Sequence, residues 1–157
     1  MSEQQAVFSI QKVYLKDLSL EIPNAPQIFT EPETPTVDIN LHNDARPLEN
    51  GLFEVVLTAT VTAKLRDKTV FLVEAAHAGI FLIQGVQQQE FEGMVNVACP
   101  RTLLPYVRET ISTILARAGF PPVLLPHVGF ETLYQQRVQE KQTVAAPVAP
   151  PVAPQAS

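Results

Sequence analysis

Residues 53–83 read FEVVLTATVTAKLRDKTVFLVEAAHAGIFLI, and this stretch decides the fold. Its first half, FEVVLTATVTAKL, alternates apolar side chains with mostly polar ones, which is the period of a β-strand with one buried face. The RDK tripeptide that follows has the composition of a hairpin turn, and the second half returns as the partner strand. The final residues, GIFLI, carry apolar side chains toward both faces. This is typical of a strand covered twice, by its own core and by something else such as a second subunit.

Shorter extended segments precede this pair of strands. Apolar residues alternate from Phe8 to Ile22, with a one-residue slip of phase near Gln11 and Lys12 that predicts a β-bulge. A second alternation, over residues 37–41, predicts another short strand with one solvated face.

An acidic strip lies in residues 16–29, KDLSLEIPNAPQIF. Asp17, Ser19 and Glu21 alternate with apolar residues, so they share one face of the predicted strand. The two prolines of this segment end the strand, because proline cannot donate a hydrogen bond to a sheet. Carboxylates beside a stiff loop suit docking to a basic partner better than catalysis, and a plain solvated face is the alternative.

Helical periodicity follows residues 85–93, a glutamine-rich segment that the sequence predicts to be a loop. Apolar residues recur at helical spacing over residues 103–118, with Pro105 expected in the first turn and Gly119 at the C-terminal cap. A second helix is predicted over residues 131–139. Strands first and helices last are typical of the α+β class, with an antiparallel sheet faced by helices.

Composition limits the kinds of function. The chain has 157 residues and 46% hydrophobic residues, which suffice for one domain with a core. Its net charge of -5 argues against nucleic acid or an anionic membrane as the main partner. No signal peptide or membrane-spanning segment is expected. We expect residues 1–7 to be flexible, residues 8–140 to form the domain, and the Pro- and Ala-rich residues 141–157 to form a disordered tail.

The sequence contains no familiar catalytic pattern, such as a nucleotide-binding loop, a zinc-protease motif or a nucleophile elbow. His42, His77 and His127 lie far apart and lack metal-ligand spacing. We therefore expect a binding protein with no cofactor and no metal, not an enzyme. The alternative from another class is a thiol-dependent enzyme or apolar-ligand carrier built on Cys99. The single cysteine otherwise fits a reducing cytosol and a small apolar role in the core.

Two long segments resemble the SecB family of protein-export chaperones of Gram-negative bacteria. They are KDLSLEIPNAPQIF and, later in the chain, CPRTLLPYVRETISTILARAGFPPVLLPHVGFETLY. FEVVLTATVTA and GIFLIQG lie between them in the same order, so the resemblance covers roughly residues 8–138. It implies a four-stranded antiparallel sheet followed by a long helix and a shorter C-terminal helix. It also implies a homotetramer that is a dimer of dimers, packed through the long helices.

The resemblance implies an ATP-independent cytosolic holdase. Such a chaperone binds unfolded secretory preproteins, keeps them competent for translocation, and delivers them to the SecA motor ATPase without inserting into the membrane. The alternative is a SecB-like general chaperone with a non-export role such as toxin control. The residues implied to bind SecA are Asp17, Glu21, Leu72 and Glu74.

A client-binding groove is implied between the crossover loop, the second strand and the C-terminal helix. For each of its apolar residues a place in the ordinary core is the alternative. The crossover loop lacks an aromatic between Glu31 and Thr36, which predicts a shallower groove. The implied groove residues are Phe29, Val37, Ile39, Leu41, Phe130, Leu133, Tyr134 and Val138.

A third implied site is the interface between subunits. His77 stands there where relatives often have glutamine, and we expect a neutral, hydrogen-bonded imidazole. The alternative is that the imidazole, which changes charge near pH 6.5, makes assembly depend on pH. The implied interface residues are Val73, Ala75, His77, Val107, Ile111 and Ile114.

Overall fold

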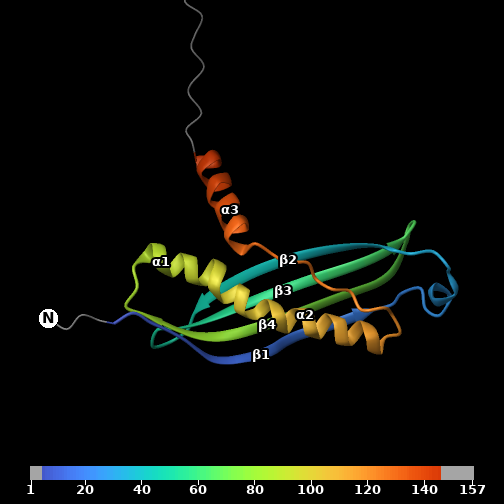
Figure 1. Cartoon of the computed structure of the whole chain (residues 1–157), viewed down its shortest axis with the longest axis horizontal. Coiled ribbons are helices and arrows are strands. Elements are labelled where there is room, and N and C mark those ends of the chain that lie inside the picture. The colour runs from blue at the N-terminus through green and yellow to red at the C-terminus, as the bar shows by residue number, and fades with distance from the viewer. Residues whose placement is uncertain (1–4, 146–157) are drawn as a thin grey trace, which may run out of the picture.

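The computed structural model describes residues 5–145, and its centre is one antiparallel sheet of four strands in the order β1-β4-β3-β2. The α-helices follow all the strands, and the longest of them lies across the sheet (Figure 1). The predicted α+β class is therefore confirmed. The strands are β1 (Val7–Glu21), β2 (Thr36–Pro47), β3 (Leu52–Leu65) and β4 (Lys68–Gln84).

The sheet has one covered face, which we name the inner face, and one open face, the outer face. Directly paired residues of antiparallel strands point to the same side. Leu57 pairs with His77, Ala59 with Ala75, and both pairs are buried under helix α2 (Cys99–Arg117). The pair between these two, Thr58 and Ala76, points to the outer face. Helix α2 contributes Leu103, Leu104, Val107, Ile111 and Leu115 to this core.

Strand β1 contains two β-bulges. The register against β4 shifts between Ile10 and Lys12, where the slip of phase predicted one, and again between Leu15 and Asp17. The second shift was not predicted. Each bulge adds one residue to β1. After it, the inward-facing side chains change from even to odd positions of the sequence, or back.

Helix formation begins earlier than predicted. The glutamine-rich segment forms α1 (Gln88–Gly93), and a π-helical turn, η2 (Met94–Ala98), joins it to α2. The loop prediction was wrong because glutamine and glutamate are good helix formers, and Phe91 packs on Phe53 with ring centroids 4.7 Å apart. Pro105 accordingly lies inside α2 and not in its first turn, while Pro100 lies at its start.

Helix α2 ends as the sequence predicts. Gly119 has a φ of +91°, and the N–H of Phe120 donates to the Leu115 carbonyl at 3.0 Å, which closes the helix with a left-handed cap. A linker leads from this cap to α3 (Phe130–Ala145), which begins beside the sheet and then projects away from it (Figure 1). Helix α3 is longer than predicted and includes five residues of the segment expected to be disordered; residues 146–157, like residues 1–4, lie outside the described part.

Candidate functional site

An apolar hollow with an aromatic wall lies where the β1–β2 crossover loop, the β3–β4 hairpin and the end of α2 meet. It has a cavity volume of about 420 Å³, and we name it the crossover hollow. The crossover loop contains a short 3-10 helix, η1 (Gln27–Thr30), and Asn24 Nδ2 ties the loop to β4 by donating to the Thr69 carbonyl at 2.9 Å. The apolar lining of the crossover hollow includes Ile28, Phe29, Val37, Leu65, Val70, Phe71, Phe120 and Val123.

Three aromatic rings form one wall of the crossover hollow. Phe29 stacks on Phe120 with centroids 5.0 Å apart, and Phe120 contacts Phe71 at 4.9 Å. Phe71 is buried, but Phe29 keeps 48% of its surface exposed. An exposed aromatic on a ring already held in place offers a preformed contact for an apolar side chain.

The rim of the crossover hollow is acidic. Glu31 and Glu33 line it from the crossover loop. Arg66, in the β3–β4 turn, forms ion pairs with both carboxylates, and its Nη2 lies 3.9 Å from Glu31 Oε2. The hollow therefore combines an apolar floor with two carboxylates whose charge is partly balanced by one guanidinium.

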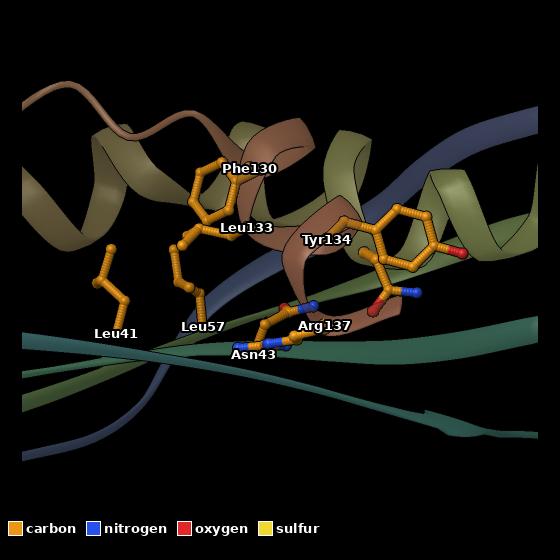
Figure 2. Close-up of a pocket in the computed structure, with 8 residues that line it drawn as sticks. Leu41, Asn43, Leu57, Phe130, Leu133, Tyr134 and Arg137 are labelled. Atoms are coloured by element: carbon orange, nitrogen blue, oxygen red, sulfur yellow. The ribbon is translucent and has the colours of Figure 1, made fainter. Parts of the chain in front are cut away.

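A second, much smaller hollow of about 20 Å³ lies between α3 and the inner face. Figure 2 shows Phe130 and Leu133 of α3 approaching Leu57 and Leu41 of the sheet. Phe130 is only 5% exposed and belongs to the core. This hollow is nearly filled by the protein's own side chains.

Polar contacts join α3 to α1 and to α2, and a further one joins η2 to β2. Tyr134 donates its hydroxyl to Glu92 Oε2 at 3.1 Å, and desolvation and that carboxylate raise the pKa of Tyr134. An ion pair joins Arg101 to Glu131. Asn43 donates through Nδ2 to the Val95 carbonyl at 2.9 Å, while its buried Oδ1 has no partner among the described residues.

The predicted groove residues do not form one continuous site in this structure. The crossover hollow includes Phe29 and Val37, whereas Ile39 packs on the core between the hollows. A third hollow beside α3 contains Val138 together with Tyr134. The groove stays a prediction, and the structure divides it into an open aromatic end and a nearly closed end under α3. The residues at the closed end are Leu41, Phe130, Leu133 and Tyr134.

The four residues predicted to bind SecA lie together on the outer face. Glu21 of β1 pairs directly with Leu72 of β4, and Glu74 pairs with Ser19. Asp17 points to the same face, opposite Ala76. Thr60 of β3 donates to Glu74 Oε2 at 3.0 Å. The arrangement is a small apolar centre, Leu72, flanked by carboxylates.

A buried carboxylate on the outer face was missed by the sequence analysis. Glu54 is 5% exposed and accepts hydrogen bonds from Tyr14, Lys16 and Arg46, at 2.7 Å for Lys16 and 3.0 Å for Arg46. Burial opposes its charged form, but the hydrogen bonds from Lys16 and Tyr14 outweigh burial and hold the pKa of Glu54 below its ordinary value. Burial and the bond to Glu54 raise the pKa of Tyr14 to about 12. The cluster joins β1, β3 and β2.

Most residues predicted at the subunit interface lie inside the subunit. Val73, Ala75, Val107 and Ile111 are fully buried between the sheet and α2, and Ile114 is half-buried. A direct role of these residues at a subunit interface stays a prediction.

His77 lies under α2 on the inner face. Its Nε2 is 2.6 Å from Thr110 Oγ1, while its buried Nδ1 has no partner among the described residues. Leu15 and Leu57 flank it on the neighbouring strands, and Tyr106 covers it with a centroid distance of 6.0 Å. Burial lowers the pKa of His77, although the Glu109 carboxylate opposes that shift.

Cys99 offers little for thiol chemistry. Its side chain is fully buried at the start of α2, and burial raises the pKa of the thiol to about 12. The thiolate that a nucleophile requires is therefore scarce at neutral pH. Within residues 5–145, no three His, Cys, Asp or Glu side chains gather as a metal site would require. None of the helices in that range has both the length and the apolar character to cross a bilayer.

Comparison with known proteins identifies the family. The family model described as preprotein translocase subunit SecB matches residues 1–141. A protein-export protein SecB of Nitrosospira multiformis is 54% identical over 148 residues, covering 94% of this chain and 93% of that protein. The one of Methylobacillus flagellatus is 58% identical over 139 residues, covering 88% of each chain.

Among solved structures, the Mycobacterium tuberculosis Rv1957 SecB-like chaperone, in complex with a ChAD peptide from the Rv1956 HigA1 antitoxin, shares the fold. Its TM-score is 0.64 at 18% identity, over 77% of this chain and 90% of that chain.

Proposed function

This chain belongs to the SecB family, and from that premise we propose that it is a protein-export chaperone. It binds unfolded segments of preproteins without ATP, keeps them from folding, and passes them to the SecA ATPase. We place this activity in the cytoplasm. Chaperones of this family are not enzymes, and no residue is assigned a catalytic role.

The observation that carries client binding is the crossover hollow. An unfolded preprotein exposes extended apolar segments, and a receptor for them needs an apolar surface that is already formed. The exposed Phe29 ring and the floor of aliphatic side chains supply that surface. One hollow of this size gives weak binding, so a long client gains affinity by occupying several hollows of an oligomer.

A direct test mixes the full chain with a labelled, slowly folding preprotein, either unfolded or folded beforehand, and measures anisotropy. We expect binding of the unfolded form alone. Phe29→Ala should weaken it by roughly fivefold, since an aromatic anchor in an interface carries about 1 kcal/mol or more. Leu48→Ala is the matched control, because Leu48 is an exposed apolar side chain of the β2–β3 turn. Equal binding of folded and unfolded preprotein would contradict the proposal.

Delivery to SecA is assigned to the outer face. Carboxylates around Leu72 suit a basic surface, and they increase the rate of encounter more than they increase affinity. Asp17→Lys with Glu21→Lys should abolish SecA binding and leave client binding unchanged, because the crossover hollow lies elsewhere. Asp38→Lys with Asp44→Lys is the control, since it reverses the same number of charges on the same face but on β2. Loss of SecA binding in both double variants would attribute the effect to net charge.

The proposed assembly is a dimer of dimers. Support comes from β1, which pairs with β4 alone among the described strands, and from apolar side chains that α2 leaves uncovered. Light scattering should give a particle of four subunits. A monomeric particle that binds clients would separate the chaperone activity from the assembly. The uncovered side chains are Phe8, Ile10, Leu15 and Tyr106.

The alternative function is a general chaperone outside export. The M. tuberculosis neighbour, a SecB-like chaperone bound to an antitoxin peptide, shares the fold. The grouping of Asp17, Glu21, Leu72 and Glu74 on one face favours export.

A further inference from the structure

We propose that Arg66 is a specificity-determining residue of the crossover hollow, acting as an internal competitor for the cationic side chains of clients. The inference rests on the proposed client-binding function. A lysine or arginine of an extended apolar client must take the place of Arg66 on Glu31 and Glu33.

Arg66 is positioned by an unusual backbone conformation. It has a φ of +55° in the turn between β3 and β4, a region that side chains other than glycine and asparagine seldom occupy. From this turn its guanidinium reaches across to the crossover loop and contacts Glu33, with Glu31 at 3.9 Å. No other cation forms an ion pair with these two carboxylates within residues 5–145.

The two carboxylates belong to the rim of the crossover hollow. Thr34 and Pro35 continue the rim between Glu33 and Val37, and the floor beneath is apolar. An apolar segment seated there would place a flanking basic side chain beside Glu31 and Glu33. Charge complementarity therefore selects one occupant, an extended apolar peptide that carries lysine or arginine.

Arg66 is easy to displace. Its side chain is 69% exposed and Glu33 is 51% exposed, so water solvates both groups and the ion pair is weak. Replacement of Arg66 by a client cation exchanges one exposed ion pair for another. The guanidinium that the client displaces turns to solvent. The protein therefore prefers basic clients less strongly than it would if Glu31 and Glu33 had no cation beside them.

The experiment compares two labelled peptides with the same phenylalanine and leucine residues, one with lysine at both ends and its twin with glutamine. Binding of each to the full chain is measured by anisotropy at low and high salt. Arg66→Asn removes the guanidinium with a residue that tolerates positive φ. Lys68→Gln is the control, since it removes the same charge from an exposed position of the same hairpin.

We expect Arg66→Asn to raise affinity for the lysine peptide about two- to fivefold, the range of an exposed ion pair, and to leave the glutamine peptide unchanged. High salt should reduce the gain. Glu31→Gln with Glu33→Gln should abolish the difference between the peptides, and adding Arg66→Asn to that pair should change nothing.

Two results would overturn the inference. If Arg66→Asn weakens or strengthens both peptides alike, Arg66 only fastens the loop and does not select clients. If Lys68→Gln gives the same gain as Arg66→Asn, the effect comes from net charge. The proposed function fails in a different way, because then neither peptide binds the unaltered protein.

Discussion

The two faces of β3 and β4 are made from alternate residues of the same strands, yet they differ in almost every physical respect. On the inner face Leu57, Ala59 and Val61 are fully buried under α2. On the outer face Thr58, Thr60 and Thr62 remain partly exposed, and the carboxylates Glu74 and Asp38 lie opposite Thr60 and Thr62. The fold depends on the first face, and SecA binding is proposed for the second. A single strand thus supports both because its side chains alternate.

The strongest test of this difference compares neighbours in the chain. Leu57→Ala should lower the free energy of unfolding by about 2–5 kcal/mol, because it leaves a cavity in the closed core. Thr58→Ala, one residue further and on the outer face, should change it by about 0.5 kcal/mol. Urea unfolding at one fixed protein concentration measures both. Similar losses would mean that the outer face is also packed against something.

Glu54 lies on the outer face but is as buried as residues of the inner face. Glu54→Gln should cost about 1–3 kcal/mol, because the buried position then lacks the carboxylate that Lys16 and Arg46 require. The folded state holds the pKa of Glu54 below 4.5, so its stabilisation is complete above that pH and is lost as the pH falls through the folded value.

Urea unfolding across acid pH tests the Glu54 prediction, with Glu49→Gln as the control in an exposed turn. A wild-type acid profile that Glu54→Gln leaves unaltered would contradict the role of the cluster.

His77 should give a smaller effect on the inner face. Burial lowers its pKa, so the unfolded chain takes up a proton first as the pH falls below about 6.5. Stability is therefore full above that pH and declines below it, with Glu109 moderating the loss. His77→Gln should remove this decline between about pH 7.5 and 5.5. Native mass measured over the same range separates a change in assembly from a change in folding, and an unaltered decline in the variant would exclude His77 as its source.

The smallest change in stability is expected on the acidic part of the outer face. Asp17→Asn with Glu21→Gln should alter the free energy of unfolding by no more than about 0.5 kcal/mol, since both side chains are exposed. The same variant should slow SecA association and weaken its dependence on salt. A large loss of stability would show that these carboxylates hold the sheet together.

The alternation of apolar and polar residues over residues 53–83 predicted the division into two faces, because any half-buried strand points alternate side chains to opposite faces. The grouping of Glu21 with Leu72 depended on register, which the hairpin sets for β3 and β4 but two bulges set for β1. Both bulges leave a step of three residues in the apolar pattern, from Ile10 to Val13 and from Leu15 to Leu18, but only the first step was interpreted as a bulge. Glu54 was missed because its partners come from β1 and β2, and no local pattern marks a carboxylate that distant cations cover.

The crossover hollow was predicted in part. Phe29 and Val37 follow from the family resemblance, but Arg66 is an ordinary turn residue in the sequence. Its contact with the crossover loop joins positions more than thirty residues apart. The early start of the helix was hidden because glutamine-rich segments suit loops and helices alike.

Each of the two bulges of β1 reverses the even–odd order of the inward-facing residues, so the second bulge restores the order that the first one changes. Side chains at even positions, Phe8 and Ile10, face inward before the first bulge, odd positions do so between the bulges, and Leu18 and Leu20 restore the even phase after the second. The extra residue of either bulge can be lost without a change of face, because Ile10 and Lys12 already oppose the neighbouring residues Phe81 and Ile80 of β4, and Leu15 and Asp17 oppose His77 and Ala76. Loss of a residue from a regular stretch of the strand would instead exchange the two faces on one side of the deletion.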